Sequence, residues 1–249
     1  DTPQNVTNHL LKRVRERGGK GTVRVDKISD GNAAAGFTWT WTSGNQEGLR
    51  GTTFVLLNAM GEIQYVREAA EPLYKPGDAI VEVLKTVTKD APPRPPREYQ
   101  PRTPTSASDI VDYLFCDVQG GSIDECMKFY DENIVYRDFN YEDAFVGKAQ
   151  VRKFVEDFNF PGIEFRIELI DGGIDSCCYT WDVVIGDSPS TIKGVSYCEV
   201  DPDTRKLTYV RDCPESAIKP PPLGKLARTL RPGLGVLDPV PIGSRPGGL

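Results

Sequence analysis

The sequence predicts an α+β protein in which one four-stranded β-meander occurs twice. Segments within residues 23–68 recur 142 to 144 residues further along the chain. In both copies β-branched and aromatic residues alternate with other residues, which is the period expected of half-buried strands. Helical patterns precede the second copy, and helices set apart in sequence from an antiparallel meander are typical of the α+β class.

The repeat can be followed residue by residue. The matched segments, first copy against second, are 23–28 (VRVDKI) and 165–170 (FRIELI), 36–41 (GFTWTW) and 178–183 (CYTWDV), 49–51 (LRG) and 192–194 (IKG), and 65–68 (YVRE) and 209–212 (YVRD). The offset is 142 at Trp39 and Trp181, and it is 144 at Tyr65 and Tyr209. An offset this constant indicates a true internal repeat, so the two meanders should superpose at these residues.

Composition divides the chain into four parts. Residues 91–105 contain six prolines, which restrict φ and remove backbone donors, so we expect an extended linker there. Residues 218–249 form a basic tail rich in proline and glycine, which we also expect to be extended. A truncated repeat, one helix at about 5–17 plus a meander, then occupies residues 1–90, and a complete domain occupies residues 106–217.

The complete domain should begin with helices. Ser106 or Ser108 is expected to cap a helix over about 106–118, and Ser122 one over about 122–132, with Glu125 completing a capping box. A short strand at 134–138 and a third helix at about 148–158 follow. The four strands of the second meander are then expected at about 163–170, 176–186, 191–201 and 205–212.

Two segments of the complete domain carry a family resemblance. Residues 122–138 (SIDECMKFYDENIVYRD) and 145–154 (FVGKAQVRKF) resemble the SnoaL-like branch of the NTF2-like superfamily. The resemblance covers about residues 106–215. It implies two NTF2-like cones with curved antiparallel sheets, the first truncated and the second closed by its helices.

A narrower resemblance concerns the tail. Residues 218–234 (IKPPPLGKLARTLRPGL) are similar to the C-terminal signature of plastid SnoaL-like proteins of algae and plants, and the whole layout is similar to an accessory stromal subunit of photosystem I in diatom-type algae. This implies a non-catalytic accessory subunit on the stromal side of the thylakoid membrane, with photosystem I subunits as partners. The chain starts at Asp1 rather than Met, so we expect a targeting peptide to have been removed.

The two arms are the expected partner-binding parts. Leucines of the tail fall on one face of a short amphipathic helix, and the basic residues around them can pair with acidic partner surfaces. The residues expected to bind partners are Arg94, Arg97, Lys219, Leu223, Lys225, Leu226, Arg228, Leu230 and Arg231.

Composition excludes several classes of function. The net charge of −6 argues against nucleic acid as the main partner, and no apolar run is long enough to span a bilayer. A single histidine, His9, and the lack of any CxxC pair lead us to expect no metal site, and we expect no cofactor. The six cysteines lack paired spacing, so we expect free thiols.

An enzyme or carrier for a small apolar molecule is the alternative function. The polar residues that could line the second cone are Tyr136, Asp138, Asp182, Tyr197 and Tyr209. A Tyr–Asp pair of the ketosteroid-isomerase type is what the resemblance allows. The residues alone also fit another interpretation, in which Tyr136 and Tyr209 are aromatic residues of the core and Asp138 and Asp182 lie at turns or on the surface. Because no oxyanion donor can be assigned opposite a base, we expect no catalytic residues.

Two observations would separate the hypotheses. A pocket of roughly 300 Å³ or more that contains a buried carboxylate would favour the enzyme or carrier. A cone filled with side chains would favour the assembly subunit.

Overall fold

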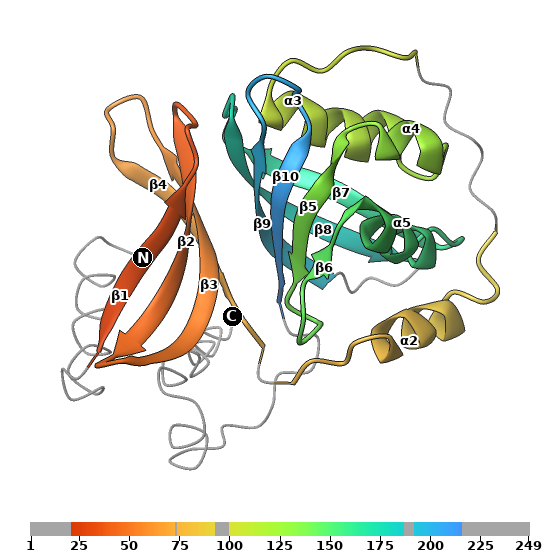
Figure 1. The fold of residues 1–249 in the computed structure, drawn as a ribbon, viewed down its shortest axis with the longest axis horizontal. Coiled ribbons are helices and arrows are strands. Elements are labelled where there is room, and N and C mark those ends of the chain that lie inside the picture. The colour runs from red at the N-terminus through yellow and green to blue at the C-terminus, as the bar shows by residue number, and fades with distance from the viewer. Residues whose placement is uncertain (1–20, 73, 93–99, 187–191, 216–249) are drawn as a thin grey trace, which may run out of the picture. The chain divides into compact units, whose positions relative to one another are not determined.

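The computed structural model describes residues 21–72, 74–92, 100–186 and 192–215. As the sequence predicts, these residues form a mixed α+β structure with two β-sheets (Figure 1). Within these ranges no helix is long and apolar enough to cross a membrane.

The first sheet has four strands in the order β1-β2-β3-β4, as expected for a meander. The strands are β1 (Thr22–Ile28), β2 (Ala34–Ser43), β3 (Gln46–Leu57) and β4 (Ile63–Ala70). The β3–β4 turn is stabilised by the Asn58 side chain, which accepts from the N–H groups of Met60 and Glu62, both at 2.9 Å. Gly61 has φ +77° there, a conformation that favours glycine.

The second sheet has six strands in the order β6-β5-β10-β9-β8-β7. The strands are β5 (Tyr130–Asp138), β6 (Phe145–Val146), β7 (Ile163–Ile170), β8 (Ser176–Ile185), β9 (Ile192–Val200) and β10 (Leu207–Pro214). The four strands β7–β10 lie within two residues of their predicted positions. β5 pairs with β10 in parallel, which the meander pattern does not predict because the two strands are far apart in sequence.

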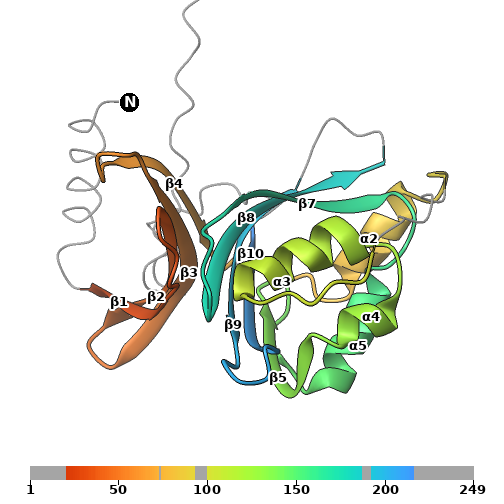
Figure 2. The same cartoon turned by 90° about the horizontal axis from the view of Figure 1, so that it is seen from above.

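Three helical segments cover one face of this sheet (Figure 2). They are α3 (Ala107–Asp112), which continues as the π-helix η1 (Tyr113–Val118), then α4 (Ile123–Met127) and α5 (Lys148–Asp157). Ser106 and Ser122 act as the N-caps and accept from the backbone N–H three residues on, each at 3.1 Å. The predicted helix over 122–132 is too long, because the chain enters β5 at Tyr130 and pairs with β10 instead.

One helix was not predicted. α2 (Ala79–Val87) lies in the chain between the first sheet and the proline-rich segment, where no helix is expected from the sequence. Val81 and Leu84 of this helix are buried, whereas Val83 and Val87 are exposed. The predicted helix at 5–17 lies outside the described residues.

The first copy of the repeat holds its tryptophan in a chain of hydrogen bonds. Trp39 Nε1 donates to Thr53 Oγ1 at 3.0 Å, and that hydroxyl donates to the Glu68 carboxylate at 3.4 Å. The Trp39 ring lies over Gly51, so closely that an added Cβ would be 2.4 Å from the ring.

The second copy repeats this arrangement. Trp181 Nε1 donates to Ser196 Oγ at 2.7 Å, Ser196 in turn donates to Asp212, and the Trp181 ring covers Gly194. The tyrosines also correspond: the Phe54–Tyr65 and Tyr197–Tyr209 ring pairs both have centroids 6.3 Å apart in edge-on contact. These matching contacts confirm that the repeated residues have equivalent places in the two meanders.

Repeat-equivalent residues also meet one another. Ser29 and Asp171, which are 142 positions apart, form a hydrogen bond of 2.5 Å from the Ser29 hydroxyl to the Asp171 carboxylate. Ser29 Oγ accepts from Gly36 N at 2.7 Å, and Asp171 Oδ2 accepts from Cys178 N at 2.8 Å. In each copy of the repeat, the side chain at this contact therefore accepts from the backbone N–H group seven residues further along the chain.

A small apolar core lies beside this contact. Its buried members come from both meanders and from the residue after β5, and they are Ala34, Phe54, Ala69, Phe139, Cys178, Val195, Tyr197 and Cys213. Ala34, Phe54 and Ala69 of the first meander are therefore packed against residues of the second sheet.

Replacing Asp30 by alanine is expected to weaken the attachment of the segment between β1 and β2 to residues 174–176. The Asp30 carboxylate accepts from the backbone N–H groups of Ile174, Asp175 and Ser176, each at 3.0 Å. Desolvation opposes ionisation, but these bonds outweigh it and lower the pKa of Asp30. We expect Asp30→Ala to reduce the free energy of unfolding by about 1–2 kcal/mol.

Urea unfolding would measure this effect. Asp30→Asn, which retains one acceptor oxygen, should lose less stability, and Asp203→Ala, at an exposed turn, should lose little. Equal stabilities for Asp30→Ala and wild type would show that the hydrogen bonds from the Asp30 carboxylate to residues 174–176 do not stabilise the protein.

All six cysteines are free thiols. Cys177 and Cys198 face each other across β8 and β9, with their sulfur atoms 3.3 Å apart, well beyond a disulfide bond length. Both are fully buried.

Candidate ligand pocket

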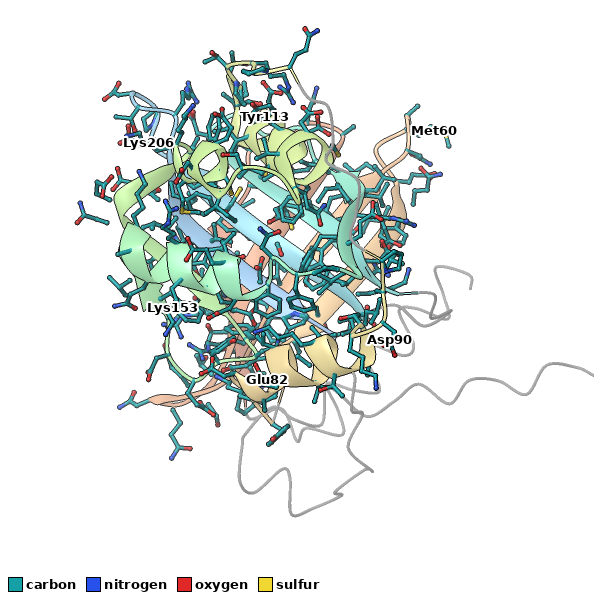
Figure 3. All side chains as sticks on the ribbon, turned by 90° about the vertical axis from the view of Figure 1, so that its right-hand side faces the viewer. Met60, Glu82, Asp90, Tyr113, Lys153 and Lys206 are labelled. Carbon is teal, nitrogen blue, oxygen red and sulfur yellow. The ribbon has the colours of Figure 1, made fainter. Side chains whose placement is uncertain are left out.

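A cavity of about 340 Å³ lies between the six-stranded sheet and the helices. In Figure 3 the helical segments that carry Tyr113, Lys153 and Glu82 surround this face of the sheet. The cavity walls come from α2, η1, α4, α5 and strands β5, β7, β8, β9 and β10. None of the described residues that line the cavity is a lysine, arginine or histidine. The volume lies in the range of small-molecule sites.

Aromatic rings form much of the wall. Phe154 of α5 packs against Tyr136 and Phe158, with both ring centroids 5.1 Å away. Trp181 and Phe165 form a second pair at 5.9 Å. All five side chains line the cavity, which therefore offers large apolar surfaces to a ligand.

Asp212 of β10 is the centre of a hydrogen-bond network at the cavity wall. Its carboxylate accepts from the hydroxyl groups of Tyr136 and Ser196, and Ser196 accepts in turn from Trp181 Nε1. Desolvation raises the pKa of Asp212 above its ordinary value, although the two hydroxyl donors act in the opposite direction.

Asp138 lies beside Asp212. The two residues are register partners on the parallel strands β5 and β10, and both line the cavity. Asp138 is only 7% exposed, and its Oδ1 accepts from Asn140 N at 2.6 Å. Burial, together with the charge of Asp212, raises the pKa of Asp138 to about 8.

This pair can hold one proton at neutral pH. Like charges on neighbouring carboxyl groups disfavour double ionisation, so the first charge resides on one group while the other stays protonated. The hydroxyl donors favour Asp212 as the ionised member, and Asp138 is then the protonated one. The cavity thus contains both a proton donor and a proton acceptor.

The structure brings together only some of the predicted residues. Tyr136 and Asp138 line the cavity, as the second cone requires. The interpretation of Asp138 as a turn or surface residue is wrong, because it ends β5 inside the domain.

Three other candidates lie on the opposite face of the sheet. Side chains alternate along a strand, and Trp181, Ser196 and Asp212 belong to the cavity side. Their alternation places Asp182, Tyr197 and Tyr209 on the far face, where both tyrosines pack in the small core described above. These three predictions of cavity-lining residues are therefore wrong.

Asp212 is a site residue that the sequence did not reveal, although the repeat matches it to Glu68. A carboxylate at the same place in both copies of the repeat was the available signal. Gln119, Tyr130 and Asn140 are further polar residues of the wall, and no sequence pattern marked them.

No group of three or more His, Cys, Asp or Glu residues suited to a metal occurs within residues 21–72, 74–92, 100–186 and 192–215. The predicted partner-binding residues lie outside the described part of the chain. They are Arg94, Arg97, Lys219, Leu223, Lys225, Leu226, Arg228, Leu230 and Arg231.

Part of this domain is similar to known proteins. Residues 111–208 match the model of the SnoaL-like domain family. A comparison with curated protein sequences finds no match.

Several solved structures are similar. An NTF2-like protein of unknown function from Cytophaga hutchinsonii has 11% identity and a TM-score of 0.38 over 46% of this chain and 95% of that chain. A protein of unknown function with a cystatin-like fold from Methylobium petroleophilum has 15% identity and a TM-score of 0.39, over 58% of this chain and 100% of that chain. The epoxide hydrolase/cyclase-like enzyme SalBIII has 18% identity and a TM-score of 0.36, over 43% and 88%. Within this chain, residues 111–208 are a SnoaL-like domain.

Proposed function

We propose that the cavity binds a small, uncharged, largely apolar molecule and that Asp138 and Asp212 exchange protons with it. The observation that carries this proposal is the pair of adjacent carboxyl groups in an apolar cavity, where no described lining residue is basic. Perturbed carboxyl groups in a cleft are typical of sites of proton transfer.

The wall selects against charged anions. An anionic ligand would meet the negative charge of the carboxyl pair, and none of the lining residues in the described part of the chain is a cation that could compensate that charge. Aromatic rings and a volume of about 340 Å³ suit a ligand of modest size. A carbonyl group would suit Asp138, because a protonated carboxyl group donates a hydrogen bond.

Keto–enol exchange is the reaction that these groups can perform. The Asp212 carboxylate accepts a proton from the carbon next to the carbonyl, while Asp138 gives its proton to the carbonyl oxygen. The C–H bond breaks, its electron pair forms the enol double bond, and the reverse transfers restore the ketone. No oxidant or other reactant is needed.

Deuterium exchange tests this chemistry without knowledge of the natural ligand. The protein is incubated in D₂O with butyrophenone, and NMR follows deuterium uptake next to the carbonyl. We expect Asp138→Asn and Asp212→Asn to slow catalysed exchange by about 100-fold or more. Asp182→Asn, on the far face of β8, is the matched control and should exchange like the wild type.

The pH dependence provides a second readout. Exchange should fall as the pH rises above about 8, because Asp138 then loses the proton that it donates. Binding of the ketone without any protein-dependent exchange would contradict proton transfer and leave a carrier as the function.

The pocket meets the criterion set from the sequence for an enzyme or carrier, so this proposal replaces the expectation of no catalytic residue. Assembly with a plastid membrane complex through the two arms stays a prediction. The partner-binding residues on which that prediction rests lie outside the described part of the chain.

A further inference from the structure

Helix α2 supplies a wall of the cavity although it lies outside the SnoaL-like domain of residues 111–208. Ile80 and Leu84 point into the cavity lining, and Leu84 is only 5% exposed. These positions are four residues apart and share one face of the helix. Val83 and Val87 of the same helix are exposed.

The start of α2 is tied to the loop after β5. Gly77 N donates to Asn140 O at 2.8 Å, and the Tyr141 hydroxyl hydrogen-bonds to the Asp78 side chain. Gly77 has φ +56°, so the chain turns into the helix at a position that favours glycine. Asn140 itself lines the cavity.

The end of α2 is tied to the loop between α5 and β7. Gly162 lies against Thr88 and Ala91, so closely that an added Cβ would be 2.7 Å and 2.6 Å from their Cβ atoms. Lys85 Nζ lies 6.0 Å from the centroid of the Phe160 ring, which also lines the cavity. α2 therefore bridges two loops that both contribute to the cavity wall.

We propose that Ile80 and Leu84 determine the length of ligand that the pocket accepts. The inference rests on the proposed function only in taking this cavity as a ligand site. Because α2 is held at both ends, its two side chains act as a fixed wall, and removing their atoms should open volume for the ligand. Each methylene that a ligand can newly bury should increase its affinity about fourfold, the equivalent of about 0.8 kcal/mol.

A homologous series of neutral ketones tests this. Phenyl n-alkyl ketones from acetophenone to octanophenone compete with the fluorescent probe N-phenyl-1-naphthylamine for the wild-type protein and its variants. Affinity should rise with chain length and then level off. We call the chain length at which affinity stops rising the levelling point. Leu84→Ala, which removes three carbon atoms, should shift this levelling point to ketones that are longer by about two or three carbons. Val83→Ala, at an exposed position of the same helix that does not line the cavity, is the matched control and should leave it unchanged.

Ile80→Ala provides a second variant in case Leu84→Ala folds poorly, and it should also favour longer ketones. An unchanged levelling point in both variants would overturn the proposal, as would a failure of every ketone to displace the probe from the wild type. A shifted levelling point without deuterium exchange would support this inference and refute the proposed proton transfer.

Discussion

Asp138→Asn is expected to stabilise the protein at alkaline pH, by several kcal/mol. In the folded protein the pKa of Asp138 is raised from 3.8 to about 8, chiefly by burial. Ionising this group therefore opposes folding, at about 1.4 kcal/mol for each unit between the two pKa values. Asparagine carries no charge and retains the Oδ1 that accepts from Asn140.

The sign follows from proton binding. Between the unfolded pKa near 4 and the folded pKa near 8, the folded state holds the proton more tightly than the unfolded state. The stabilising contribution of the protonated group is complete below about pH 4 and is lost as the pH rises through about 8. The stability of the wild type should therefore decline relative to the variant across this window.

Urea unfolding at pH 5 and pH 8 would measure the effect. The advantage of Asp138→Asn should grow by about 4 kcal/mol between these values, because the slope approaches 1.4 kcal/mol per pH unit. Asp182→Asn should show no such growth. A constant difference between Asp138→Asn and the wild type would show that the carboxyl group ionises as it does in water.

Gly194→Ala is expected to destabilise the protein and to disturb the pocket. A Cβ at this position would lie 2.2 Å from the Trp181 ring, far inside van der Waals contact. Trp181 also lines the cavity and reaches Asp212 through Ser196, so displacing the ring disrupts both. The loss should be about 3 kcal/mol, at the upper end of the range for overpacked sites.

A double-mutant cycle identifies the cause. Trp181→Phe removes the ring atoms that would clash, so the Gly194→Ala change should cost much less in that background. Gly51→Ala should also destabilise the protein, because its added Cβ would lie 2.4 Å from the Trp39 ring and 2.7 Å from the Ala69 carbonyl oxygen. Trp39→Phe should therefore relieve only part of its cost. Equal costs in both backgrounds would locate the strain in the backbone instead.

The sequence alone predicted the strands of both meanders and the equivalence of their tryptophans and tyrosines. Alternation is a local property of the chain, and the repeat offset is read directly from the residues. Two caps, at Ser106 and Ser122, were likewise predictable, since they depend on neighbours within three residues.

The site required the tertiary structure. Alternation separates the two faces of a strand but does not say which face borders a cavity, so Asp182, Tyr197 and Tyr209 were placed on the wrong side. The pair of Asp138 and Asp212 exists because β5 and β10 associate in parallel across 74 positions of sequence. Their raised pKa values arise from enclosure, which no local pattern encodes.

The same distinction between local sequence and tertiary contacts applies to helix α2. Its sequence can form a helix, but its contribution to the cavity comes from contacts with Asn140, Tyr141 and Gly162, more than 50 positions away. The sequence thus determined which segments form strands and that one unit is duplicated. Packing between distant segments decided where the cavity lies, which carboxyl groups face it and which helix closes its wall, because burial and proximity are properties of the folded chain.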